Sequence, residues 1–235
     1  MVVDNRQRHR RLRLLLKKLN KERKRQAQKT DILCNDLIAA QRSFIKRLKT
    51  ISFTANLYES IIGTTDLNDL LYTAARIIRT EDADANVTFF LRSGEDASTD
   101  LCAGFELHTF ESSPPITFEK QHSLDGARDR LENCFGPELM NSICTSNAVC
   151  TLEDMFAMDV QGNLTGLNNI SAATFPLGVP GSSSGFMLVY RSSEHKLTAD
   201  EIDRIRAVTC GLSRAIDSCQ ALARASSSGD PHAAD

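Results

Sequence analysis

The hydrophobic and polar positions of the first residues follow the period of an α-helix. Leu12, Leu15, Leu16 and Leu19 fall at i, i+3, i+4 and i+7, which places them on one face of a helix. Lysine and arginine side chains occupy the remaining faces of the same stretch. We therefore predict that the chain opens with a helix that has one apolar stripe and is basic elsewhere.

A heptad pattern follows, with two apolar positions in each repeat. Leu37, Phe44, Ile51 and Tyr58 recur every seven residues, Leu48, Ala55 and Ile62 follow with an offset of four, and Leu33 and Ala40 extend the seam. Such a seam is typical of a coiled coil or a helical bundle, and Gly63 is suited to end the helix. A helix over about residues 8–62 is roughly 80 Å long at 1.5 Å per residue. That length exceeds one small domain, so we predict a partner helix.

A second helix and then a series of strands come next. Leu67 to Ile78 keep the helical period, with Thr65 as the expected cap and acidic residues in the first turn. The period then changes to two residues at 87–92 and 101–108, which indicates strands, and 116–118 is a possible third. Residues 123–158 lose this rhythm and are expected to form short helices and loops.

The end of the chain predicts a hairpin and a long helix. Two strands are expected at 171–178 and 185–191, joined by a Pro-Gly-Ser turn. Thr198 and Glu201 then have the spacing of a capping box, which marks the start of a helix. Its apolar positions again alternate three and four apart, and we expect them to form another bundle seam.

This order of elements predicts an α+β fold, an antiparallel sheet flanked by helices from both ends of the chain. Both faces of the strand at 87–91 are apolar, so both faces of the sheet should be covered. We expect the terminal helices on one face and the irregular insert on the other, with a pocket beneath the insert. The predicted parts are a basic helical arm (1–30), a dimerisation helix (31–62), a domain (63–224) and a disordered tail (225–235).

The last third of the chain resembles the GAF domain, a small-molecule sensor module related to PAS. The matching stretch runs from Ile170 to Asp217, with a strand ending in Pro-Leu, a glycine-containing turn, a second strand and a capped helix. The helix at 67–79 and the strand at 87–92 match the opening of the family. The resemblance covers roughly residues 60–224 and implies a GAF-like sensor fold. The family's cyclic-nucleotide signature is not found. None of the seven cysteines is directly followed by a histidine, as is common in bilin-binding members.

Charge and cysteine usage refine this picture. Residues 1–30 carry 12 Lys/Arg against 2 Asp/Glu, whereas the rest of the chain is acidic. Such an arm can bind nucleic acid, an anionic membrane or an acidic partner, and we assign this role to residues 6–29. Seven cysteines without a CxxC spacing predict neither a disulfide framework nor a zinc site. No apolar run is long enough to span a membrane, and we predict a cytoplasmic protein.

Candidate chemistry is sparse. The stretch Gly181-Ser-Ser-Ser-Gly185 matches a nucleophile-elbow pattern, but it joins two strands rather than a strand and a helix, which favours a hairpin turn. Cysteines in the insert are either buried packing residues or, if activated, nucleophiles or redox sensors. No metal site is predicted, and the sequence names no cofactor. The candidates for the ligand pocket are Phe90, Cys102, His108, Phe118, Phe135, Cys134, Cys144 and Phe175.

The function that these features favour is a dimeric sensory or regulatory protein that binds a small ligand or a partner protein and signals through its helical stalk. The candidates for the dimer interface are Leu37, Phe44, Leu48, Ile51, Tyr58, Ile205, Leu212 and Ile216. One alternative is a thiol enzyme, because a branch of the resembled fold reduces free methionine sulfoxide. Another is a nucleic-acid or membrane-surface binder acting through the arm.

Overall fold

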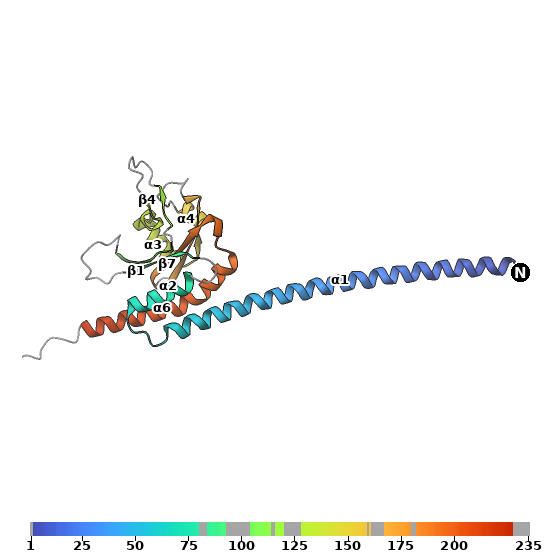
Figure 1. Cartoon of the computed structure of the whole chain (residues 1–235), viewed down its shortest axis with the longest axis horizontal. Helices are drawn as coiled ribbons and strands as arrows, with labels where there is room; N and C mark the ends of the chain where they lie inside the picture. The colour runs from blue at the N-terminus through green and yellow to red at the C-terminus, as the bar shows by residue number, and fades with distance from the viewer. Residues whose placement is uncertain are drawn as a thin grey trace, which may run out of the picture. The chain divides into compact units, whose positions relative to one another are not determined.

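The computed structural model describes residues 2–79, 84–92, 104–113, 116–119, 128–158, 160, 167–179 and 182–227. The chain divides into two compact units, residues 1–49 and residues 50–235. Helix α1 (Val2–Ile61) begins in the first unit and ends in the second (Figure 1). The long N-terminal helix that the heptad pattern predicts is therefore confirmed.

The first unit consists of the N-terminal part of α1, and its large apolar side chains are exposed. They include leucines of the basic stretch and residues of the heptad seam: Leu12, Leu15, Leu16, Leu19, Leu33, Leu37, Phe44 and Leu48. Exposed leucine stripes of this size are what a partner helix covers in a coiled coil. The pairing itself stays a prediction.

The second unit contains the last turns of α1 and every other element. These are α2 (Leu67–Arg79), β1 (Asn86–Arg92), β2 (Phe105–Phe110), β3 (Phe118–Glu119), β4 (Arg128–Asp129), η1 (Leu131–Cys134), α3 (Pro137–Ser146), β5 (Cys150–Thr151), α4 (Leu152–Ala157), β6 (Ile170–Val179), β7 (Ser182–Ser192), η2 (Ser193–His195) and α6 (Ala199–Ser227). The insert, defined here as residues 128–160, contributes the short helices that its irregular sequence predicts.

The sheet confirms the α+β prediction. Five strands lie in the order β2-β1-β7-β6-β5, and neighbouring strands pair antiparallel. The short strands β3 and β4 pair with each other in a second sheet. The strand expected at 101–108 is seen as β2, which starts at Phe105 and ends at Phe110, and residues 101–103 lie outside the described residues.

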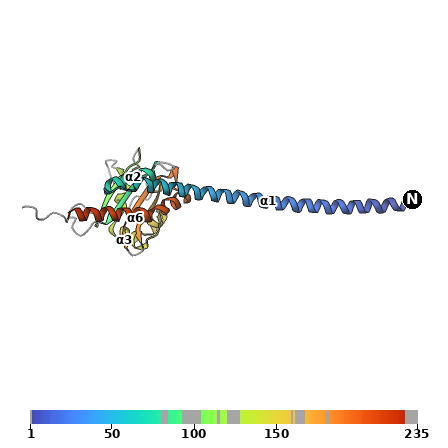
Figure 2. The ribbon, with the colours of Figure 1, turned by 90° about the horizontal axis from the view of Figure 1, so that it is seen from below.

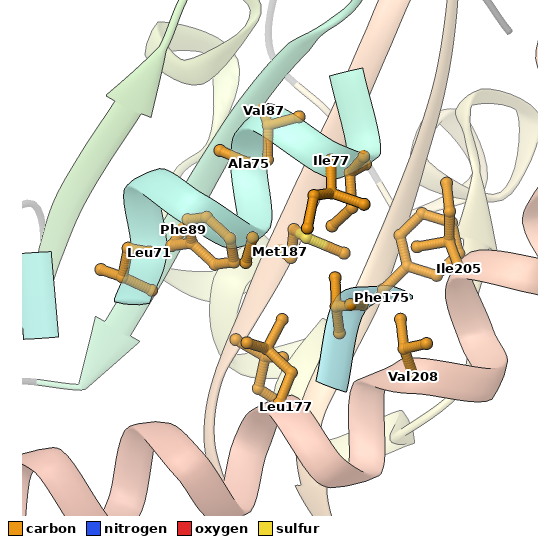
Figure 3. Packing of buried hydrophobic residues seen from close by; sticks show 14 of the residues in the cluster. Leu71, Ala75, Ile77, Val87, Phe89, Phe175, Leu177, Met187, Ile205 and Val208 are labelled. Carbon is orange, nitrogen blue, oxygen red and sulfur yellow. The ribbon is translucent and has the colours of Figure 1, made fainter. Parts of the chain in front are cut away.

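Helices cover one face of the sheet, which we call the helix face. Phe89, Met187 and Phe175 lie side by side across β1, β7 and β6 and face side chains of α2 and α6 (Figure 3). The buried Phe53, Leu57 and Ile61 of α1 belong to the same core. Helices α2 and α6 run next to each other over this face (Figure 2).

The insert covers the opposite face, which we call the insert face. Phe90, Phe186, Leu188 and Tyr190 of β1 and β7 point to this side and form a second core with residues of η1, α3 and α4. The apolar side chains of one strand thus contribute to two cores, because successive side chains point to opposite faces of the sheet. The expected division between terminal helices and insert is found.

Short-range signals fix where the helices start and stop. Gly63 follows α1 with φ +83°, a conformation that suits glycine after a helix. Thr198 and Glu201 form the predicted capping box, with the Glu201 N–H donating to Thr198 Oγ1 at 3.2 Å and the Thr198 N–H to Glu201 Oε2 at 2.7 Å. The expected cap at Thr65 is wrong by one residue, because Asp66 Oδ1 accepts the Asp69 N–H at 2.9 Å.

Candidate ligand site beneath the insert

The centre of the insert face is a cluster of phenylalanine rings. Phe90 stacks on Phe186 with ring centroids 4.5 Å apart, and Phe135 of the insert lies 5.4 Å from Phe90 and 5.8 Å from Phe186. Phe105 contacts Phe186 edge-on at 6.1 Å, and the Arg92 guanidinium lies 5.9 Å from the Phe105 ring centre. Stacked and edge-on pairs add to the burial energy of such rings. The insert is therefore held to the sheet by aromatic contacts.

A buried carboxylate lies next to this cluster. Glu132 of η1 is 6% exposed, yet it reaches the sheet and accepts two hydroxyl hydrogen bonds. Thr88 Oγ1 donates at 2.5 Å, and the Tyr190 hydroxyl donates at 2.9 Å and 3.1 Å to the two carboxylate oxygens. A carboxylate in an apolar core needs such donors, because burying it unpaired is costly. Glu132 and its two hydroxyl donors, here called the Glu132 cluster, give the insert a fixed polar contact with β1 and β7.

The hydroxyl of Tyr190 stays protonated in this position. Burial, and then the negative charge of Glu132, raise the pKa of Tyr190 far above its ordinary value. The phenol therefore acts as a hydrogen-bond donor at every physiological pH. Tyr190 shares the parity of Phe186 and Leu188 along β7, which explains why it points to the insert rather than to the helices.

The insert cysteines are buried thiols. Cys134, Cys144 and Cys150 are all in the core beneath the insert. Burial raises the pKa of the Cys144 thiol, although the Ser183 hydroxyl and the Arg92 guanidinium beside it act in the opposite direction. Burial likewise raises the pKa of the Cys150 thiol. Because the thiolate is the reactive form, these environments disfavour nucleophilic chemistry.

Tertiary contacts bring a cation to Cys144 that the sequence does not place there. No Lys, Arg or His lies within four residues of Cys144 along the chain. Arg92 comes from the end of β1, fifty-two positions away in the sequence. Its attraction for a thiolate is nevertheless smaller than the cost of burying the charge.

The serine of the elbow-like stretch has a structural role. Ser183 lies at the start of β7, and its hydroxyl contacts the carbonyl oxygens of Leu177 at 2.9 Å and Gly185 at 2.6 Å. Two residues on, Gly185 has φ +152°, and a Cβ there would lie 2.0 Å from the carbonyl oxygen of Phe90. The strand context expected for this stretch is confirmed, and glycine is required where β7 passes β1.

The predicted pocket residues divide between the two faces. Phe90, Phe135, Cys134 and Cys144 come together beneath the insert. Phe175 does not, because it lies in the core of the helix face (Figure 3), and its assignment to the pocket is corrected.

Of the remaining pocket candidates, one lies on the helix side. His108 is on the edge strand β2 opposite Phe89, so it too belongs to the helix side, where it lies 3.3 Å from Glu106. Its assignment is therefore also corrected. Phe118 is in β3, away from the main sheet in the pairing order, and Cys102 lies outside the described residues.

The predicted dimer residues also divide. Leu37, Phe44, Leu48 and Ile51 are exposed on α1. Tyr58 is half-buried, and its hydroxyl lies where a Cβ on Gly211 of α6 would be. Three candidates on α6 are corrected, since their side chains are buried against the chain's own sheet: Ile205, Leu212 and Ile216.

Sequence reasoning missed Glu132, Thr88, Tyr190 and Arg92. The parity of β7 is a signal that places Tyr190 on the insert face. An acidic residue in an irregular stretch carries no comparable signal, because most such residues are solvated. Glu132 becomes visible only when the insert folds over the sheet.

The residues that the structure describes include neither a metal site nor a membrane-spanning helix. No group of three or more His, Cys, Asp or Glu side chains in the described ranges is arranged to hold a metal ion. Within the same ranges, no helix is both long and apolar enough to cross a membrane.

Comparison with solved structures identifies the fold. The chain is similar to the GAF domain of a phosphoenolpyruvate-protein phosphotransferase from Coxiella burnetii, with a TM-score of 0.50 and 14% identity over 77% of this chain and 98% of that one. It is also similar to the corresponding GAF domain from Acinetobacter (TM-score 0.48, 10% identity, 74% and 97% covered). A GAF/HD domain protein from Geobacter sulfurreducens matches with a TM-score of 0.45 and 14% identity over 68% and 97%.

Sequence comparison adds no relative. No family model and no curated protein matches the chain. The fold is nevertheless GAF-like, as the strand order, the capped terminal helix and the likeness to the Coxiella domain agree. The resemblance expected from the last third of the sequence is confirmed at the level of fold.

Proposed function

We propose that the chain is a dimeric, cytoplasmic sensory or regulatory protein. Its GAF-like domain binds a small ligand or a partner protein beneath the insert and signals through α1. The observation that carries this proposal is that the last turns of α1 belong to the domain core. Phe53, Leu57 and Ile61 are buried in the core of the helix face, directly behind the strands that form the insert face. We therefore expect a shift of β1 or β7 on ligand binding to displace the last turns of α1.

Support for dimerisation comes from a second apolar face on the same turns of α1. Ile51 is 64% exposed and Ile62 is 77% exposed, although their neighbours Phe53 and Ile61 are buried. One face of this segment thus serves the domain and another is open to a partner. Ile51 continues the heptad of Leu37 and Phe44, and Ile62 follows Leu48 by two heptads, which favours a coiled-coil contact between two copies.

Support for the sensory assignment comes from the composition of the insert face. The aromatic rings of the insert face and the Glu132 cluster combine apolar surface with a few fixed polar groups, the composition of small-molecule sites. Support for a reducing compartment comes from the six cysteines within the described part of the chain, all of which are free thiols.

The test is native mass spectrometry of the full chain at micromolar concentration. We expect a dimer of the 26.0 kDa chain, with any retained ligand seen as added mass. The double variant Phe44→Asp/Ile51→Asp should be monomeric, because charges in a seam oppose pairing. Arg42→Asp/Lys49→Asp introduces the same residues two positions earlier, off the seam, and should remain dimeric. A monomeric wild type, or equal effects of both variants, contradicts the proposal.

A further inference from the structure

The basic part of α1 is a strongly charged surface that the sensory proposal does not use. Residues 7–29 are helical and exposed, and they carry eleven Lys/Arg against a single glutamate, Glu22. At 1.5 Å per residue this arm, residues 7–29, is about 34 Å long. Each arm therefore presents a net charge of about +10 over that length.

The leucines of the arm share the phase of the heptad seam. Leu12 and Leu19 precede Leu33 by multiples of seven residues, and Leu16 precedes Leu37 likewise. A partner helix that covers the seam also covers these leucines, which are exposed by 55–56% in the single chain. Pairing directs the lysines and arginines away from the partner, to the outside of the two-helix rod, except Arg23, which takes a seam position seven residues after Leu16. This step rests on the proposed dimer.

Pairing two such arms brings like charges together. About twenty net positive charges then lie along about 34 Å, close to 0.6 charges per Å. A duplex of B-form DNA carries about one negative charge per 1.7 Å, again close to 0.6 per Å, and one helical turn spans about 34 Å. A polyanion of this density offsets the repulsion along the whole arm.

We infer that the paired arms bind the phosphate backbone of duplex DNA without regard to base sequence. A membrane surface is a poorer match, because an interfacial helix must insert the leucines that pairing covers. Single-stranded nucleic acid is poorer too, since residues 7–29 contain no Phe, Tyr or Trp on which bases stack. The contacts are charge contacts from lysine and arginine to phosphate oxygens.

The test measures binding of the full chain to a fluorescent 30-base-pair DNA of arbitrary sequence, by anisotropy between 50 and 300 mM salt. The logarithm of the binding constant should fall linearly with the logarithm of salt concentration, with a slope of about 0.9 for each phosphate contact. Lys17→Gln/Lys18→Gln/Lys21→Gln should weaken binding at least tenfold at 100 mM salt and reduce the slope. Lys196→Gln/Arg206→Gln/Arg214→Gln removes as many exposed cations from the domain and should change neither.

Parallel samples separate the outcomes. Absence of DNA binding at 50 mM salt overturns the inference, as does binding to vesicles containing phosphatidylserine in preference to DNA. Tighter binding of a duplex RNA of equal length overturns the assignment to DNA. Equal losses in the arm and domain variants also overturn it. Native mass measured on the same samples reports the proposed dimer independently: a monomer that binds DNA contradicts the dimer and retains the arm as the binding surface.

Discussion

The two faces of the sheet are built from the same strands and covered in different ways. On the helix face, residues such as Phe89, Phe175 and Met187 meet apolar side chains of α1, α2 and α6. On the insert face, Phe90 and Phe186 meet the insert, and a carboxylate is buried among them. Apolar packing is non-directional, whereas a buried carboxylate requires particular donors. The helix face is thus stabilised mainly by the apolar area it buries, with the Arg191–Glu201 ion pair at its edge, whereas the insert face has its buried carboxylate beside the central rings.

This difference suggests different roles for the two faces of the sheet, one in stability and one in the proposed recognition of a ligand. A continuous apolar core couples the sheet to long helices and tolerates little change in volume. The polar contact at Glu132 instead holds a short, irregular segment to β1 and β7 through particular hydrogen-bond donors. The proposed function places signal transmission at the helix face and ligand contact at the insert face, and each placement makes predictions.

The largest effect is expected from Phe89→Ala. Phe89 is fully buried at the centre of the helix face, and removing a buried ring costs about 3–5 kcal/mol in the free energy of unfolding. Tyr72→Ala removes an aromatic ring that is 58% exposed on α2 and should cost far less. Urea unfolding followed by circular dichroism measures both. A loss below about 1 kcal/mol for Phe89→Ala would show that the helix face is not the stabilising core.

A smaller effect is expected from Glu132→Ala. The change leaves the hydroxyls of Thr88 and Tyr190 buried without their acceptor, which costs about 1–3 kcal/mol. A double-mutant cycle with Tyr190→Phe isolates the contact, and the combined variant should lose less than the sum of the two single ones. Glu153→Ala, an exposed position of the same insert, is the control. Strict additivity would argue that the carboxylate does not hold the insert to β7.

A pH-dependent effect is expected where β7 meets the start of α6. Arg191 forms a buried ion pair with Glu201, which also belongs to the capping box. Burial alone raises the pKa of Glu201, but hydrogen bonds from Arg191 and from Thr198 outweigh it and hold the pKa below the ordinary 4.5. The carboxylate therefore stabilises the fold fully above about pH 4.5, and this contribution is lost as the pH falls through the lowered pKa.

Measuring the free energy of unfolding between pH 3 and 7 tests this pair. Glu201→Gln should lose stability at neutral pH and show a shallower decline on acidification than the wild type. Glu194→Gln, an exposed glutamate of the adjoining turn, should follow the wild-type curve. Parallel curves for Glu201→Gln and the wild type would mean that the pKa of Glu201 is not lowered by folding.

The smallest effect on stability is expected from changes at the insert cysteines, and the quantity to measure there is the reactivity of their thiols. Alkylation by iodoacetamide should reach the exposed Cys34 and Cys210 well before Cys144 or Cys150, whose buried thiols have raised pKa values. Mass spectrometry of digests at successive times resolves the order. The same sample should show no turnover of methionine sulfoxide. Rapid labelling of Cys144, or turnover lost in Cys144→Ala, would favour the thiol enzyme over the sensor.

The sequence by itself determined the elements that depend on local periods and caps. The heptad predicts α1, the spacing of Thr198 and Glu201 predicts the start of α6, and the apolar residues on both faces of β1 predict two cores. These signals are local, because helix and strand periods and capping hydrogen bonds involve residues a few positions apart. They are sufficient to predict a GAF-like order of helices and strands.

Only the tertiary structure decided what each apolar stripe contacts. Ile205 and Leu212 have the spacing of a dimer seam, but they pack on the chain's own sheet. Phe175 faces the helices rather than the insert, and Glu132 finds donors on strands forty-four and fifty-eight residues away. The physical reason is that a stripe of apolar residues predicts that the face is buried, but not which helix, strand or partner chain covers it. That identity depends on contacts between segments distant in the sequence, which no local pattern encodes.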